Sequence, residues 1–146
     1  MIRKRKKGQA IVEMALVFPF FLLIIVGGLI DFGFAFYNFL ALQQVANDTA
    51  QWAAESNGKV GVTQNTDISQ YANSKKPSWW TGTFTVHPVQ VEALTTGGQI
   101  LKVILSYESP TYTPFYQTIF KATTGVGYIK LATLAAYKIP EHVTTH

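Results

Sequence analysis

The sequence predicts an α+β protein: a long N-terminal helix, transmembrane first and amphipathic afterwards, followed by a small antiparallel β-sheet of about three strands. Two observations carry this prediction. A run of 17 uncharged, mostly apolar residues lies between Glu13 and Asp31, close to the length that spans a bilayer. Three segments of the C-terminal half (84–94, 99–109 and 126–139) are rich in the alternating apolar residues that are typical of strands.

Five basic residues within positions 3–7 precede the apolar run. By the positive-inside rule they place the N-terminus in the cytoplasm, so we expect the C-terminal part to be extracytoplasmic. Residues 9–146 contain seven Lys or Arg and eight Asp or Glu, a net charge of −1. A nucleic-acid-binding surface needs a basic patch on the folded part, so no nucleic acid is expected as a partner.

Helical geometry relates the two acids at the ends of the apolar run. Glu13 and Asp31 are 18 residues apart, which puts them on one helix face and about 27 Å from each other. Each carboxylate can therefore lie near one membrane interface, Asp31 at the outer one. A cleaved signal peptide would have a shorter apolar core and a small-x-small cleavage site. A buried soluble helix would need a larger protein around it.

The helix is expected to continue beyond the membrane, from about residue 10 to about residue 56, where Asn57-Gly58 can end it. Apolar or small residues recur there with a helical period and form a stripe that we expect the sheet to bury: Phe32, Ala35, Phe36, Phe39, Leu42, Ala46, Thr49, Ala50 and Ala53.

Residues 57–83 are polar and read as a connector with one helical turn at most. Its Trp79-Trp80 pair either anchors the connector on the sheet or forms an aromatic patch that faces a partner or lipid.

The remainder, 84–146, is expected to form the extracytoplasmic β domain. Pro88 makes the first strand an edge or bulged strand. In the second strand one face is apolar and should face the core: Leu101, Val103, Leu105 and Tyr107. A short helix is expected near 114–121. The last segment, 126–139, is assigned as a strand, with a helix as the competing assignment.

No catalytic constellation is present in the sequence. The chain has no cysteine, which excludes disulfides, cysteine zinc sites and thiol catalysis. None of the common hydrolase, metalloprotease or phosphate-binding motifs occurs. Glu92 and Glu108 are better explained as solvated strand residues than as an acid–base pair. We therefore expect no enzyme activity, no cofactor and no metal site.

Residues 8–55 resemble the N-terminal region of TadE-like proteins, the minor pseudopilins of tight-adherence (Tad/Flp, type IV-like) pili. The shared features are G-x-A-x-V-E before a hydrophobic helix, the triplet Asp31-Phe32-Gly33, and the spacing from Asn38 to Gln43. The sequence has Met14 where Flp-type pilins usually have Tyr and TadE-like proteins often have Phe or another apolar residue. It has Phe34 where the family often has a basic residue.

The resemblance implies that a prepilin peptidase cleaves between Gly8 and Gln9 at the cytoplasmic face. Glu13 then becomes the fifth residue of the mature helix, where its carboxylate can pair with the new α-amino group of a neighbouring subunit. The alternative is a helix-end acid that pairs with the leader lysines. Three small residues, Gly27, Gly28 and Gly33, are expected to allow close helix packing.

The leading interpretation is a minor pilin or pseudopilin needed for Tad pilus assembly. Its expected partners are the prepilin peptidase, other pilin or pseudopilin subunits, the inner-membrane pilus assembly complex and membrane lipid. Its expected location is the cytoplasmic (inner) membrane, as a single-pass protein, and the filament itself. The parts are a cleaved leader (1–8), the helix (9–56), the connector (57–83) and the β domain (84–146). The alternative is an uncleaved single-span anchor that presents the β domain to an envelope or secretion-complex partner. A membrane-tethered enzyme is disfavoured.

Overall fold

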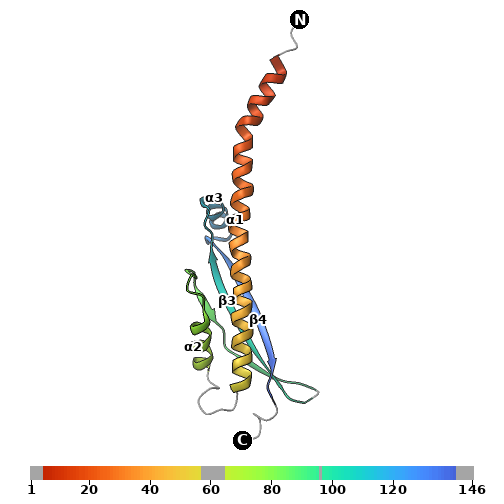
Figure 1. The fold of residues 1–146 in the computed structure, drawn as a ribbon, viewed down its shortest axis with the longest axis vertical. Helices are drawn as coiled ribbons and strands as arrows, with labels where there is room; N and C mark the ends of the chain where they lie inside the picture. Colours follow the sequence, from red (N-terminus) through yellow and green to blue (C-terminus); the bar gives the residue numbers. More distant parts are fainter. Residues whose placement is uncertain (1–4, 57–64, 96, 141–146) are drawn as a thin grey trace. The chain divides into compact units, whose positions relative to one another are not determined.

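The computed structural model describes residues 5–56, 65–95 and 97–140, with side chains from Gly8 onward. The elements follow in the order α1 (Arg5–Ser56), α2 (Asn65–Lys75), β1 (Phe84–Val86), β2 (Gln90–Ala93), β3 (Gln99–Pro110), α3 (Pro114–Thr124) and β4 (Tyr128–Lys138). The fold is α+β, with a long N-terminal helix and a small antiparallel sheet, as predicted (Figure 1).

The chain divides into two compact units, and the helix α1 contributes to both. The first unit combines residues 1–34 with 111–127, and therefore contains the apolar half of α1 and the helix α3. The second combines residues 35–110 with 128–146, and contains the second half of α1, α2 and the sheet. α1 continues through Pro19 without a break.

The sheet is built around β3. It pairs antiparallel with β4 along one side and with β1 and β2 along the other. The sequence predicted three strands, but the first of them is two strands, because residues 87–89 interrupt it at Pro88. Proline has no N–H to donate to the neighbouring strand, which explains the interruption and agrees with the expected edge position.

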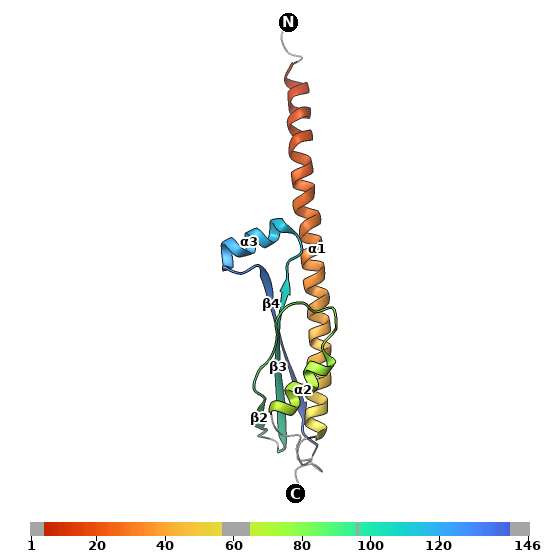
Figure 2. The ribbon, with the colours of Figure 1, turned by 90° about the vertical axis from the view of Figure 1, so that its left-hand side faces the viewer.

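The core of the second unit lies between β3 and the second half of α1, which run side by side in Figures 1 and 2. The predicted inner face of β3 is buried, with Leu101, Val103, Leu105 and Tyr107 at most 3% exposed. The facing stripe of α1 consists mainly of small residues, which let helix and sheet approach closely: Ala35, Leu42, Val45, Ala46, Ala50, Ala53 and Ala54.

Two expectations for this region are wrong. Phe32 and Phe36 were assigned to the buried stripe of α1, but both are more than half exposed. The connector was expected to contain one helical turn, yet α2 has 11 residues. Trp52 stacks on Tyr71 of α2, with ring centroids 4.3 Å apart, so tertiary packing stabilises a helix whose sequence is mostly polar.

The remaining assignments agree with the structure. Residues 128–138 form the strand β4, and the helix expected near 114–121 is α3, which extends to Thr124. Gly125 ends α3 in the left-handed conformation (φ 78°), and its N–H donates to the carbonyl of Lys121. Glycine adopts this conformation without steric cost, so the sequence ends the helix at this point.

Candidate functional site

Asp31 is the most highly connected acidic residue of the first unit. Its side chain is only 2% exposed. Its Oδ1 accepts the backbone N–H of Tyr112 at 2.7 Å and that of Thr113 at 3.1 Å, and its Oδ2 accepts the Thr113 hydroxyl. A buried carboxylate is stable only when its oxygens accept such hydrogen bonds. Asp31 therefore attaches the chain entering α3 to the apolar half of α1.

Thr113 occupies the N-cap position of α3, with extended backbone (φ −89°, ψ 131°). A threonine at this position normally accepts an N–H of its own helix through its side chain. Here the side chain makes no such bond, and its hydroxyl donates to Asp31 instead. The N-cap residue therefore holds α3 to α1 rather than capping α3.

Two of the three predicted packing glycines face α3 of the same chain. Gly27 and Gly28 are buried, and a Cβ atom added to Gly28 would lie 2.6 Å from the Tyr116 hydroxyl. That hydroxyl donates to the Ile24 carbonyl at 3.0 Å. At Gly33 a Cβ atom would meet nothing within 4 Å. Packing against other helices stays a prediction for these glycines, and Gly33 has free space for it.

The predicted cleavage site lies near the start of α1. Gly8 and Gln9 are exposed, and a Cβ atom added to Gly8 would meet nothing within 4 Å. The side-chain amide of Gln9 donates to Oε1 of Glu13, 3.1 Å away. Glu13 is exposed as well. The two positions that the resemblance assigns to processing and assembly are thus accessible and one helical turn apart.

The apolar half of α1 has an exposed surface of unusual size. Every described side chain from residue 8 to residue 26 is exposed, including Ile11 at 69% and Phe20 at 68%. α1 is long and apolar enough to cross a membrane. The core helix of a soluble protein would be mostly buried, so this exposure favours a membrane segment.

The two tryptophans of the connector have different environments. Trp80 is 4% exposed, stacks on Tyr107 at 4.2 Å and donates from Nε1 to Oδ1 of Asn38 at 3.1 Å. Asn38 in turn donates to Ser109 Oγ at 3.0 Å. Trp79 is 53% exposed and lies beside Tyr37. Trp80 is thus an anchor, and Trp79 is half exposed.

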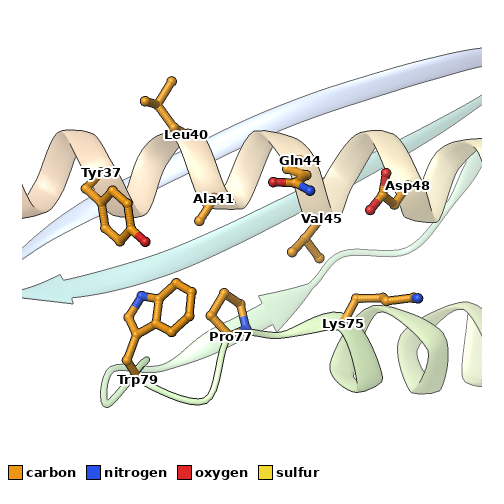
Figure 3. A pocket seen from close by; sticks show the side chains of 9 residues that line it. All are labelled: Tyr37, Leu40, Ala41, Gln44, Val45, Asp48, Lys75, Pro77 and Trp79. Carbon is orange, nitrogen blue, oxygen red and sulfur yellow. The ribbon is translucent and has the colours of Figure 1, made fainter.

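Trp79 and Tyr37 form one end of a groove of about 430 Å³ between α1 and the segment after α2 (Figure 3). Asp48 and Lys75 line the other end. The carboxylate and the ammonium group are drawn on opposite walls, from α1 and α2. The groove combines an aromatic end with an end that carries both charges, but its residues form no catalytic constellation.

The structure brings two pairs of titratable groups together on the sheet. Lys102 Nζ and Glu92 Oε2 form an ion pair at 2.6 Å. The Tyr128 side chain is hydrogen-bonded to Glu108, and this bond raises the pKa of Tyr128 above its ordinary value of 10.0. Among the described residues, no three His, Asp or Glu side chains gather as a metal site would require.

Sequence reasoning missed Asn38, Thr113 and Tyr116. Asn38 could have been recognised from its spacing, because it lies two helical turns after Asp31 on the face of α1 that packs inward. Polar residues on such a face require partners. Ser109, Tyr112 and Thr113, the partners that lie 71 to 82 positions along the chain, have no comparable signal.

Residues 8–51 match the family described as TadE-like protein. This segment of the chain is similar to TadE-like proteins. This confirms the resemblance, and the match begins at Gly8, the residue at which cleavage is predicted. The TadE-like family is a pilus-associated structural family. Its match ends within α1, before α2, the sheet and α3. Searches among curated proteins and solved structures give no match.

Proposed function

We propose that the chain is a minor pilin, or pseudopilin, of a Tad-type pilus, and that a prepilin peptidase processes it between Gly8 and Gln9. The observation that carries this proposal is the TadE-like match from Gly8 through the exposed apolar half of α1. Such a surface requires lipid before assembly and other apolar helices after it. The basic residues before Gly8 keep the cleavage site on the cytoplasmic side.

Glu13 has a specific role in this proposal. Cleavage creates an α-amino group on Gln9, one helical turn before Glu13. Within a bundle of apolar helices, the carboxylate of one subunit attracts the α-amino group of its neighbour far more strongly than in water. Because an unpaired charge in this environment is costly, the pair fixes the stagger between adjacent subunits.

The position of α3 supports a place for such a subunit at the end of a filament. Tyr116 covers Gly27 and Gly28 in the same chain, so neighbouring helices cannot approach that face closely. A subunit with one obstructed face fits the end of a filament better than its middle. The same observation also favours the second candidate, an uncleaved single-span anchor that presents its sheet to an envelope partner.

N-terminal sequencing distinguishes the two. Wild type, Gly8→Leu and the control Gly33→Leu are each recovered from membranes of cells that express the pilus system, and the wild type is also recovered from sheared filaments. We expect wild type and control to begin at Gln9, and Gly8→Leu to retain residues 1–8. An intact N-terminus in the wild type, with recovery from membranes alone, would overturn processing and leave the anchor.

A further inference from the structure

The helix α3 has apolar side chains but no buried residue. Its residues divide into three edges by helical spacing. Tyr116 and Phe120 form one edge and contact Phe32 of α1, with ring centroids 5.9 and 6.4 Å apart. Gln117 and Lys121 form the polar edge. Packing within the chain therefore accounts for one of the two apolar edges only.

The remaining edge consists of Phe115, Ile119 and Ala122, all exposed. This apolar edge points away from the segment that follows α3, because the polar edge of Gln117 and Lys121 faces that segment. A Cβ atom added to Gly127 would lie 3.0 to 3.5 Å from the side chains of Lys121 and Gln117. Figure 2 shows α3 directed away from α1 rather than along it. The uncovered apolar edge thus extends sideways from α1.

An apolar groove connects this edge to the apolar surface of α1. It has a volume of about 510 Å³, and its walls are apolar except at Thr113. Leu23, Val26 and Ile30 line it from α1, and Pro114 and Phe115 from α3. Beside the groove, Leu22, Ile25 and Leu29 are 50 to 76% exposed. The edge of α3 is thus continuous with the surface that would face acyl chains.

The depth of α3 along α1 is set by two hydrogen bonds. Asp31 holds the start of α3, and the Tyr116 hydroxyl donates to the Ile24 carbonyl. Ile24 precedes Asp31 by seven residues, about 10 Å along the helix axis. Amphipathic helices at a membrane surface bury their apolar face about 5–10 Å below the headgroups. With Asp31 at the outer interface, the start of α3 lies at that level and the Tyr116 hydroxyl lies no more than about 10 Å below it.

We propose that α3 is an interfacial helix that lies in the outer surface of the membrane, with Phe115, Ile119 and Ala122 against the acyl chains of the outer leaflet. This assignment rests on the membrane insertion of α1 under the proposed function. Gln117 and Lys121 then face headgroups and water, and Lys121 suits anionic lipid. Tyr112, 52% exposed beside Phe34, has the amphipathic ring that is enriched at this level.

Site-directed spin labelling tests the assignment in the full chain. The protein has no cysteine, so single substitutions can be labelled without further changes. Ile119→Cys reports the proposed lipid edge, Gln117→Cys the polar edge of the same helix, and Leu22→Cys the bilayer segment of α1. Each is reconstituted at high dilution in phosphatidylethanolamine–phosphatidylglycerol vesicles, and label accessibility to oxygen is compared with that to a water-soluble nickel chelate.

We expect the label at position 119 to resemble that at 22, with oxygen favoured by at least about tenfold relative to position 117. Ala122→Cys, on the same edge, is a second test in case the label at position 119 displaces the helix. It should give the same result. If the nickel chelate reaches the labels at positions 119 and 122 but not the label at position 22, α3 is not an interfacial helix. The membrane insertion of α1 is unaffected by that result.

Two further outcomes would also overturn the interfacial helix. Nickel access at 22 would remove the membrane insertion on which the assignment depends. Protection at 119 that disappears on dilution of the protein in lipid would show that a second copy of the chain, and not lipid, covers this edge.

Discussion

Asp31 and Thr113 lie 82 positions apart in the chain and are joined by a backbone hydrogen bond of 3.1 Å from the threonine N–H to the aspartate carboxylate. The threonine hydroxyl donates to the same carboxylate. Hydrogen bonds to an ionised acceptor are stronger than neutral ones. This pair therefore determines where α3 attaches to the apolar half of α1.

Replacing Asp31 by Asn should loosen this attachment. The amide keeps one acceptor, but it has no charge and presents N–H groups where the Thr113 hydroxyl donates. We expect a loss of about 1–3 kcal/mol, seen as faster hydrogen exchange at the backbone amides of Tyr112 and Thr113. Asp48→Asn, an exposed carboxylate on the same helix, is the control. Equal protection in both variants would contradict the role of Asp31.

The glycines of α1 should respond differently to alanine. In Gly33→Ala the new methyl group meets nothing, so the better helix propensity should stabilise the protein by about 0.5–1 kcal/mol. In Gly28→Ala it meets the Tyr116 hydroxyl, which must leave the Ile24 carbonyl. We expect a net destabilisation there, measured by thermal unfolding in detergent. An increase in stability for both variants would show that Tyr116 moves without cost.

The two adjacent tryptophans should have unequal effects on stability. Trp80→Ala removes a buried ring and leaves the Asn38 carbonyl oxygen without its donor, so we expect a loss of about 3–5 kcal/mol. Trp79→Ala removes a half-exposed ring that lies beside Tyr37, a loss of about 1 kcal/mol or less. Denaturant unfolding of the two variants checks the difference. Comparable midpoints would be incompatible with the buried position of Trp80.

The hydrogen bond from Tyr128 to Glu108 predicts a stability change at high pH. Because the folded state raises the pKa of Tyr128 above the ordinary value of 10.0, its contribution is complete below pH 10 and is lost as the pH rises through the raised pKa. Subtracting the absorbance titration of Tyr128→Phe from that of the wild type isolates this group.

Glu108→Gln should move the titration of Tyr128 back toward its ordinary value, since the carboxylate is the main cause of the shift. Glu92→Gln changes an exposed carboxylate on β2, whose partner is Lys102, and should leave the Tyr128 titration unchanged. If both variants shift it equally, the effect comes from net charge rather than from the hydrogen bond.

Local pattern was sufficient to predict the elements whose periodicity is strong. The alternation in 99–109 gave the buried face of β3, and the long apolar segment gave α1. It was insufficient for α2, whose polar sequence is stabilised by the stacking of Trp52 on Tyr71, a contact between positions far apart. It also placed Phe32 in the buried stripe, because a hydrophobic pattern does not distinguish contact with the sheet from contact with α3 or lipid.

The prediction of the candidate site was limited in the same way. Asp31 was identified as a notable acid from its place at the end of the apolar run. Its partners, Tyr112 and Thr113, could not be identified, because backbone donors carry no mark in the sequence. For Gly8 and Glu13, the proposed roles rest on the sequence pattern and the family match, and the structure adds their exposure.

The break at Pro88 affects how the sheet can pair with a second chain. It divides one edge of the sheet into β1 and β2, of three and four residues, whereas amyloid-like stacking favours continuous strands of six or seven residues without proline. A second chain would therefore find only short stretches to pair with along this edge. The opposite edge of the sheet is β4, a continuous strand of 11 residues, so the interruption discourages pairing along one edge only.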